Sequence, residues 1–270
     1  MNIHFTNRVL FNTLNVQTIS KIKVGSHMYG LNNSDSDTDF LSIYTEPNIN
    51  RASFMWEHHQ LQYKENNIDY NFTNLQSFIR NAMTGDATIN FEVLFSDELK
   101  NSELYWLYEF RYDFINYNII KSYLGLAKRD LKYWKRDTTD NKKLSHFIRG
   151  IIFANTLING EFSMDLSKTK TFSLTDYNDL ELLDRIKHGT LDYSFEILTT
   201  YFEDLMNDLR LINNNNLRDK KIPLYMDTKR MSLLDSKVLD FTKEKADKIL
   251  ELNYSELYYE ALENGVSYWI

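Results

Sequence analysis

The sequence predicts an α+β fold, with a small mixed β-sheet and flanking helices in residues 1–100 and an all-helical module in residues 101–270. Three observations support this prediction. Short apolar runs bounded by turn residues fill the first third of the chain. After about residue 100, apolar residues recur at helical spacing nearly to the end. The chain has only 8 glycines and 2 prolines among 270 residues, too few for an all-β fold with many turns.

Four strands are expected in the first module, each an apolar run beside turn residues. Their ranges are 22–24, 40–44, 54–63 and 68–72. The first ends at Gly25, and the polar residues 64–67 are expected to form the turn between the last two. The apolar spacing then changes to that of a helix, which Thr73 or Asn74 can cap and which Gly85 ends.

The second module is expected to consist of helices separated by clusters of Asn, Asp, Gly and Thr. The predicted ranges are 103–117, 121–136, 141–158, 175–188, 193–212, 233–249 and 254–264. Four consecutive asparagines at 213–216 are expected to form a loop, because their side chains compete for backbone hydrogen bonds.

Composition and charge narrow the classes of function. A formal net charge of -7 disfavours a protein that coats nucleic acid, although a local basic patch could still bind a phosphate. The chain has no cysteine, which excludes thiolate metal sites and disulfides. Neither a signal peptide nor a spanning apolar segment is recognised, so we expect a cytoplasmic protein with no membrane partner. An asparagine-rich, proline-poor composition suggests an AT-rich genome, that of a bacterium or a phage.

The most informative residues lie around the first two expected strands. A strand that ends in Gly25-Ser26 brings two backbone N–H groups and a hydroxyl to one point, where a glycine lets an anion approach the main chain. Asp37 and Asp39 stand two residues apart beside the next strand, so both carboxylates share one face. Asp69, in the last expected strand, is the third candidate. Three carboxylates suit Mg²⁺ or Mn²⁺, which would take further ligands from the phosphates of a nucleoside triphosphate such as ATP.

Simpler interpretations stay open for each of these motifs taken alone. Residues 34–39 could form only a solvated acidic turn. Glu57 or Glu65 could replace Asp69 as the third carboxylate, and His27 could contact a phosphate or merely cap a turn.

The order of these residues resembles the nucleotidyltransferases of the DNA polymerase beta superfamily, whose pattern is G-S, a glycine, D-x-D and a later aspartate. It is most similar to the RlaP-type branch, whose G-S-x-x-Y-G-L and D-S-D-x-D motifs are matched at 25–31 and 35–39. The K-x-x-x-H-x-x-R helix of the family is matched at 142–149. Asp86 and Ala87 replace the Asn-Pro that the family has after the first helix.

The resemblance implies a polymerase-beta-like nucleotidyltransferase domain in residues 1–100 and a role for each motif. Gly25 and Ser26 would hold the β and γ phosphates of the triphosphate. Asp37 and Asp39 would bind both metal ions, and Asp69 would bind the catalytic ion and orient or deprotonate the acceptor hydroxyl. The groups that would face the triphosphate from the helical module are Lys142 or Lys143, His146 and Arg149.

The expected activity is therefore metal-dependent transfer of a nucleoside monophosphate from a triphosphate to an acceptor hydroxyl, with release of pyrophosphate. The family's association with RNA repair favours RNA as the acceptor, while a protein side chain or a small molecule stays open. Two alternatives are a nucleotide-binding regulator without catalysis and an RNA-binding or interaction protein. The second alternative would use the basic, aromatic residues 121–136.

Overall fold

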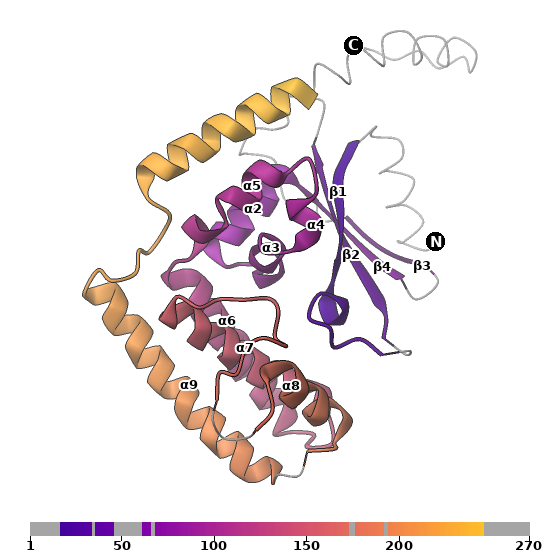
Figure 1. The fold of residues 1–270 in the computed structure, drawn as a ribbon, viewed down its shortest axis with the longest axis vertical. Coiled ribbons are helices and arrows are strands. Elements are labelled where there is room, and N and C mark those ends of the chain that lie inside the picture. The colour runs from indigo at the N-terminus through magenta and orange to yellow at the C-terminus, as the bar shows by residue number, and fades with distance from the viewer. Residues whose placement is uncertain are drawn as a thin grey trace.

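The computed structural model describes residues 17–33, 36–45, 61–65, 68–172, 176–191 and 194–245. In Figure 1 a small sheet lies beside a group of short helices, several longer helices lie below them, and the last described helix lies next to the short ones. This arrangement confirms the predicted α+β class. Residues 54–60 of the third expected strand and the expected helix at 254–264 lie outside the described residues.

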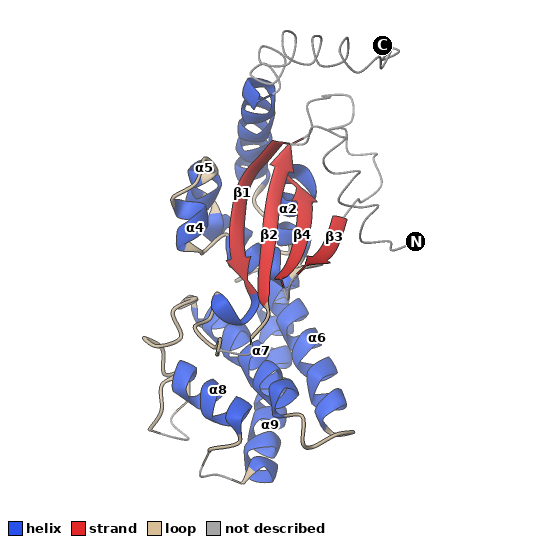
Figure 2. Cartoon of the chain, turned by 90° about the vertical axis from the view of Figure 1, so that its right-hand side faces the viewer, coloured by secondary structure: helices blue, strands red, loops and turns tan. Residues whose placement is uncertain are grey.

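The sheet has four strands in the order β1-β2-β4-β3 (Figure 2). They are β1 (Gln17–Val24), β2 (Thr38–Thr45), β3 (Leu61–Glu65) and β4 (Ile68–Asn74). β2 and β4 run parallel, whereas the β1–β2 and β3–β4 pairs are antiparallel. The sheet is therefore mixed, as the sequence predicts.

The predicted turn at 64–67 is wrong for its first two residues, which belong to β3. Lys64 pairs with Asp69 and Glu65 pairs with Ile68 across the antiparallel ladder. This pairing continues the strand through polar residues that a pattern search takes for a turn.

Helices make up most of the rest of the described chain. The short ones are η1 (Gly25–His27), α3 (Thr88–Val93), α4 (Asp97–Lys100), α5 (Tyr105–Glu109) and η2 (Arg111–Phe114). The longer ones are α2 (Leu75–Thr84), α6 (Tyr117–Trp134), α7 (Asn141–Asn159), α8 (Asp179–His188), α9 (Phe195–Arg218) and a last helix at 228–245. In the described part of the chain, none of them combines the length and the apolar character that crossing a membrane would need.

α2 forms as the sequence predicts. The Asn74 side chain accepts a hydrogen bond of 2.7 Å from the backbone N–H of Ser77, so it caps the first turn. Gly85 ends the helix at φ 75°, a left-handed conformation that glycine adopts without a Cβ clash.

The single helix expected at 103–117 is wrong, because the chain there forms α5, the 3-10 turn η2 and then a break before α6. The side chain of Asn116 accepts hydrogen bonds from the N–H groups of Asn118 and Ile119, which makes Asn116 the start of a new helix. The same side chain donates to the Met83 carbonyl at the end of α2. The break in the helix therefore places the Asn116 side chain against the end of α2.

The loop expected at the four asparagines 213–216 is also wrong, since α9 continues through them to Arg218. Asn213 is buried and its amide donates to the Tyr117 carbonyl, while the Tyr117 hydroxyl donates to Asn214. These asparagine side chains contact α6 instead of competing for their own backbone, so the helix persists.

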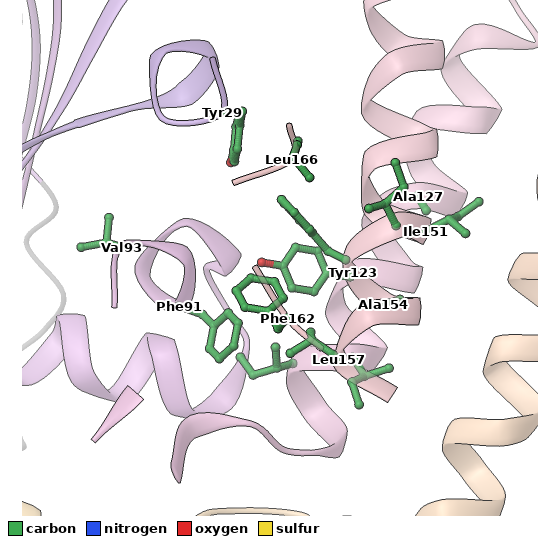
Figure 3. Packing of buried hydrophobic residues seen from close by; sticks show 14 of the residues in the cluster. Tyr29, Phe91, Val93, Tyr123, Ala127, Ile151, Ala154, Leu157, Phe162 and Leu166 are labelled. Atoms are coloured by element: carbon green, nitrogen blue, oxygen red, sulfur yellow. The ribbon is translucent and has the colours of Figure 1, made fainter. Parts of the chain in front are cut away.

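One hydrophobic cluster runs from the sheet into the long helices (Figure 3). Phe91 of α3 lies 5.3 Å from the ring centre of Phe162, which in turn lies 5.3 Å from that of Phe153 on α7. Buried residues of β1 and β2, such as Ile22 and Ile43, belong to the same cluster. The predicted division into domains 1–100 and 101–270 stays a prediction.

Replacing Gly85 with alanine is expected to destabilise the fold by about 2–4 kcal/mol, from left-handed strain plus overpacking. A Cβ at this position would lie 2.7 Å from the Ser122 hydroxyl and 3.0 Å from the Asn118 carbonyl of α6. Urea unfolding of the purified variant measures the loss.

Gly160→Ala is the matched control, because Gly160 has the same φ of 75° but no atom within 4 Å of its would-be Cβ. It is expected to cost only about 1 kcal/mol, from the backbone strain alone. Equal losses in the two variants would show that the contact of Gly85 with α6 does not matter.

Candidate active site

A cleft of about 720 Å³ lies where the end of the sheet meets the helices. This volume is within the usual range for small-molecule sites. Its sheet side is lined by Gly25, Ser26, Asp37, Asp39 and Asp69, and its helical side by residues that include Glu92, Tyr123, Arg129, Asp130, Lys142, His146, Arg149 and Lys187. The structure thus gathers most of the residues singled out in the sequence around one space.

The three aspartates meet because of strand register. Asp39 of β2 pairs directly with Asp69 of β4 in the parallel ladder, and Val24 pairs with Asp39 on the other side. Residues that face each other in a ladder share one side of the sheet, and Asp37 precedes Asp39 by two positions. Of the rival acids, Glu57 lies outside the described residues. Glu65 pairs with Ile68, the residue before Asp69, and not with Asp69 itself.

The concentration of negative charge alters the acidity of Asp39. Partial burial, and then the carboxylates of Asp69 and Asp37, raise its pKa, while Lys142 and Lys64 oppose that rise. Such repulsion is relieved when a cation binds, so this wall favours positive charge.

The donor set fits a hard divalent cation, because three carboxylates offer the oxygen ligands that Mg²⁺ and Mn²⁺ prefer. Among the residues that the structure describes, no three acidic or imidazole side chains already surround one point. The Nζ atom of Lys64 lies 3.6 Å from Asp37 Oδ2 and 3.4 Å from Asp69 Oδ1. Asp37 and Asp69 therefore share the ammonium of Lys64.

The Gly25-Ser26 turn forms the wall beside Asp39. Gly25 adopts φ +68°, and a Cβ there would lie only 2.5 Å from Asp39 Oδ2. The carbonyls of Gly25 and Ser26 accept hydrogen bonds from the N–H groups of Met28 and Leu31, which fold the turn. A glycine at position 25 is thus required both by the backbone and by the carboxylate that packs against it.

The family-like helix motif on α7 faces the acids from the helical side. Lys142, His146 and Arg149 all line the cleft, since spacings of four and three residues place them on one helical face. Lys143 does not line it; its Nζ lies 3.9 Å from Asp130 Oδ1 and 5.8 Å from the ring centre of Tyr133. Of the two lysines that the sequence left open, Lys142 is the one in the cleft.

His146 is surrounded by positive charge. Burial, and then the cations Arg149, Lys143, Lys142 and Arg129, lower its pKa from 6.5 to about 3. The imidazole is therefore neutral at pH 7 and can accept or donate a single proton in a hydrogen bond.

Two cations that line the cleft, Arg129 and Lys187, were not predicted from the sequence as site residues. Lys187 of α8 donates a hydrogen bond of 2.6 Å to the carbonyl of Leu31, and burial followed by Lys142 lowers the pKa of its ammonium. Its position 156 residues from Leu31 left no local signal. Arg129 was visible only as part of the basic stretch at 121–136.

A buried carboxylate connects the glycine-rich turn to the helices. Glu92 of α3 accepts hydrogen bonds from the Tyr29 and Tyr123 hydroxyls, the second at 2.9 Å. The Arg149 guanidinium lies 4.1 Å from the centre of the Tyr29 ring. Burial raises the pKa of Glu92 and Arg149 opposes this rise. The network positions Arg149 in the lining of the cleft. In the sequence, the sign of this network is Glu92, a glutamate within an apolar run.

His27 lies outside the cleft lining. His27 Nε2 lies 3.4 Å from the Thr38 hydroxyl, which fits a role within the turn. In the basic, aromatic stretch, Tyr123 and Trp134 are buried, whereas Tyr133 is 47% exposed. This helix therefore presents one aromatic ring and several cations to solvent.

The chain matches the family described as "RlaP: RNA repair pathway DNA polymerase beta family" over residues 8–190, about two thirds of its length. The chain belongs to this family. It is thus a nucleotidyltransferase of the polymerase beta superfamily, which confirms the resemblance seen in the sequence.

Among solved structures, the chain is similar to a nucleotidyltransferase-like protein from Exiguobacterium sibiricum 255-15. The two are 11% identical, with a TM-score of 0.28, over 80% of this chain and 76% of that one. Similarity at that level carries no argument about function, so the assignment depends on the family match. No curated protein matches the chain.

Replacing His146 with glutamine is expected to remove a pH-dependent loss of stability. The unfolded imidazole binds a proton below about pH 6.5, whereas the folded one stays neutral down to about pH 3, so wild-type stability falls with pH across that window. Between about pH 7 and pH 4.5, the wild type should lose about 2–3 kcal/mol more than the variant. Urea unfolding at both pH values checks this; parallel pH profiles would contradict it.

Gly25→Ala is expected to lower transferase activity at least about tenfold, because the new Cβ displaces the Asp39 carboxylate. The cost in unfolding free energy should be only about 1–2 kcal/mol. Gly30→Ala has a similar φ of +72° but meets only Leu180 at 3.7 Å, so it should lose similar stability and less activity. Comparable activity in the two variants would argue against the Asp39 contact.

Proposed function

We propose that the chain transfers a nucleoside monophosphate from a nucleoside triphosphate to an acceptor hydroxyl, releases pyrophosphate and requires Mg²⁺ or Mn²⁺. The observation that supports this proposal best is the opposition of charge across one cleft. Three aspartates line the sheet side, while Lys142 and Arg149 line the helical side. A metal-bound triphosphate needs both, since carboxylates hold the cation and basic groups hold the phosphate tail.

On the sheet side, Asp37, Asp39 and Asp69 would hold the metal. When bound, such ions neutralise the phosphate charge and lower the pKa of an attacking hydroxyl. Gly25 and Ser26 line the cleft beside these acids, and their backbone N–H groups and the Ser26 hydroxyl would hold the β and γ phosphates.

On the helical side, Lys142 and Arg149 would neutralise the pyrophosphate as it leaves, with Arg129 and Lys187 adding positive charge nearby. Neutral His146, between Lys142 and Arg149 on the same face, would donate or accept a hydrogen bond without adding charge. Arg149 is held in place by its contact with Tyr29, so its guanidinium is positioned before a substrate arrives.

The reaction is an in-line displacement at the α phosphorus. The acceptor oxygen forms a bond to that phosphorus, the bond to the bridging αβ oxygen breaks, and pyrophosphate leaves. The acceptor proton passes to Asp69, the acid on β4, and then to solvent.

We propose RNA as the acceptor, because the family description names RNA repair and the surface beyond the cleft is suited to it. Arg129 lines the cleft, and further along α6 the exposed Tyr133 ring lies 5.8 Å from the Arg136 guanidinium. An exposed ring among cations can stack on a base while the charges attract phosphates.

The test incubates the full chain with each nucleoside triphosphate, labelled at the α or the γ phosphate, with Mg²⁺ or Mn²⁺ and with RNA and protein from a bacterial lysate. We expect label from the α position alone to appear in an RNase-sensitive product. Label attached to protein would support the transferase activity but contradict the proposal that RNA is the acceptor.

The double variant Asp37→Asn/Asp39→Asn is expected to lose more than about 100-fold of this transfer, because neutral amides bind a divalent cation poorly. Its circular dichroism should match that of the wild type, since relieving like-charge repulsion does not harm the fold. Retained turnover in this variant would refute the proposed function. Triphosphate binding without pyrophosphate release in the wild type would instead identify a regulator.

A further inference from the structure

We infer that Lys64 is an internal counter-ion that competes with the divalent cation for Asp37 and Asp69 and thereby weakens metal binding at the site. This inference rests on the function proposed above, because it takes these acids as the metal-binding groups. It concerns a residue on the edge strand β3 that neither the motifs nor the family match singles out.

The position of Lys64 follows from strand register. Lys64 pairs with Asp69 across the β3–β4 ladder, and Asp69 pairs with Asp39 across the β2–β4 ladder. Paired residues share one side of the sheet, so the lysine and the two aspartates form a row across three neighbouring strands. Lys64, at the end of this row, therefore forms a cross-strand pair of opposite charge with Asp69.

The ammonium contacts Asp69 and also Asp37, which lies outside this row. Lys64 Nζ lies 3.4 Å from Asp69 Oδ1 and Oδ2 and 3.6 Å from Asp37 Oδ2. One cation thus bridges carboxylates of β4 and of the residue just before β2, although β3 and β2 are not adjacent in the sheet. The lysine occupies the space between two groups that a shared metal ion must approach.

A divalent ion bound to both carboxylates would lie about 2.1 Å from each oxygen, much closer than the ammonium does. The two cations cannot share that space, and they repel each other at any nearby position. Metal uptake must therefore displace Lys64 from at least Asp37.

Displacement is feasible because the lysine is loosely held. Its side chain is 45% exposed and its contacts are long for ion pairs, so the ammonium can turn out into water. The competition should consequently be modest and sensitive to salt.

The experiment measures Mn²⁺ binding to the full chain by electron paramagnetic resonance of the free ion. Lys64→Met keeps most of the apolar stem and removes the charge, so its Kd should be about 3- to 10-fold lower than that of the wild type at low salt. The difference should shrink at high salt. Lys64→Arg, which keeps the charge, should bind Mn²⁺ like the wild type.

Lys23→Met is the matched control for net charge. Lys23 is exposed on β1 and pairs with Phe40, so it lies on the opposite side of the sheet from Asp39. Its Kd should stay within about twofold of the wild type because it removes the same charge at a distance.

Asp39→Asn separates the two proposals. If it weakens Mn²⁺ binding while Lys64→Met binds no more tightly than the wild type, the counter-ion role is refuted and the metal site survives. Weaker Mn²⁺ binding by Lys64→Met than by the wild type also refutes the counter-ion role. If Asp39→Asn leaves Mn²⁺ binding unchanged, the ion is not held at these acids and both proposals fail.

Discussion

Parallel pairing of β2 with β4 sets Asp39 directly beside Asp69, and Asp37 two residues earlier adds a third negative charge. Carboxylates at such spacing repel one another, and partial burial of Asp39 adds a desolvation cost. The fold tolerates this arrangement because positive charge faces it from Lys64 and from Lys142. The repulsion arises at the end of the sheet, where these three aspartates line the cleft.

The helical part of the chain completes this site as well as covering the sheet. α7 supplies Lys142 and Arg149, and α8 supplies Lys187, whose ammonium binds the Leu31 carbonyl in the turn after β1. The buried Glu92 adds a second tie, because it accepts hydrogen bonds from a tyrosine on each side of the cleft. Fixed polar contacts of this kind reduce the reorganisation that a charged substrate would otherwise require.

Local capping rules predict where some helices begin and end. Two such predictions fail where a residue makes a hydrogen bond to a distant part of the chain. Asn74 and Gly85 bound α2 as cap chemistry predicts. Asn116, by contrast, starts a new helix inside the range expected to be continuous, and its amide also binds the end of α2. Asn213 continues a helix because its side chain finds a partner on α6. In each case a tertiary hydrogen bond outweighs an intrinsic preference of about 1 kcal/mol or less.

The sequence by itself determined the fold class, the approximate positions of β2 and β4 and the candidate acids, because alternation, capping and motif spacing act over a few residues. It also indicated the α7 motif, since one helical face is encoded in spacings of three and four. Only the tertiary structure decided that Lys142 and not Lys143 enters the cleft, that Lys187 joins it, and that Lys64 bridges two of the acids. Those choices depend on strand order and helix packing between residues far apart in the chain, for which a single sequence carries no local signal.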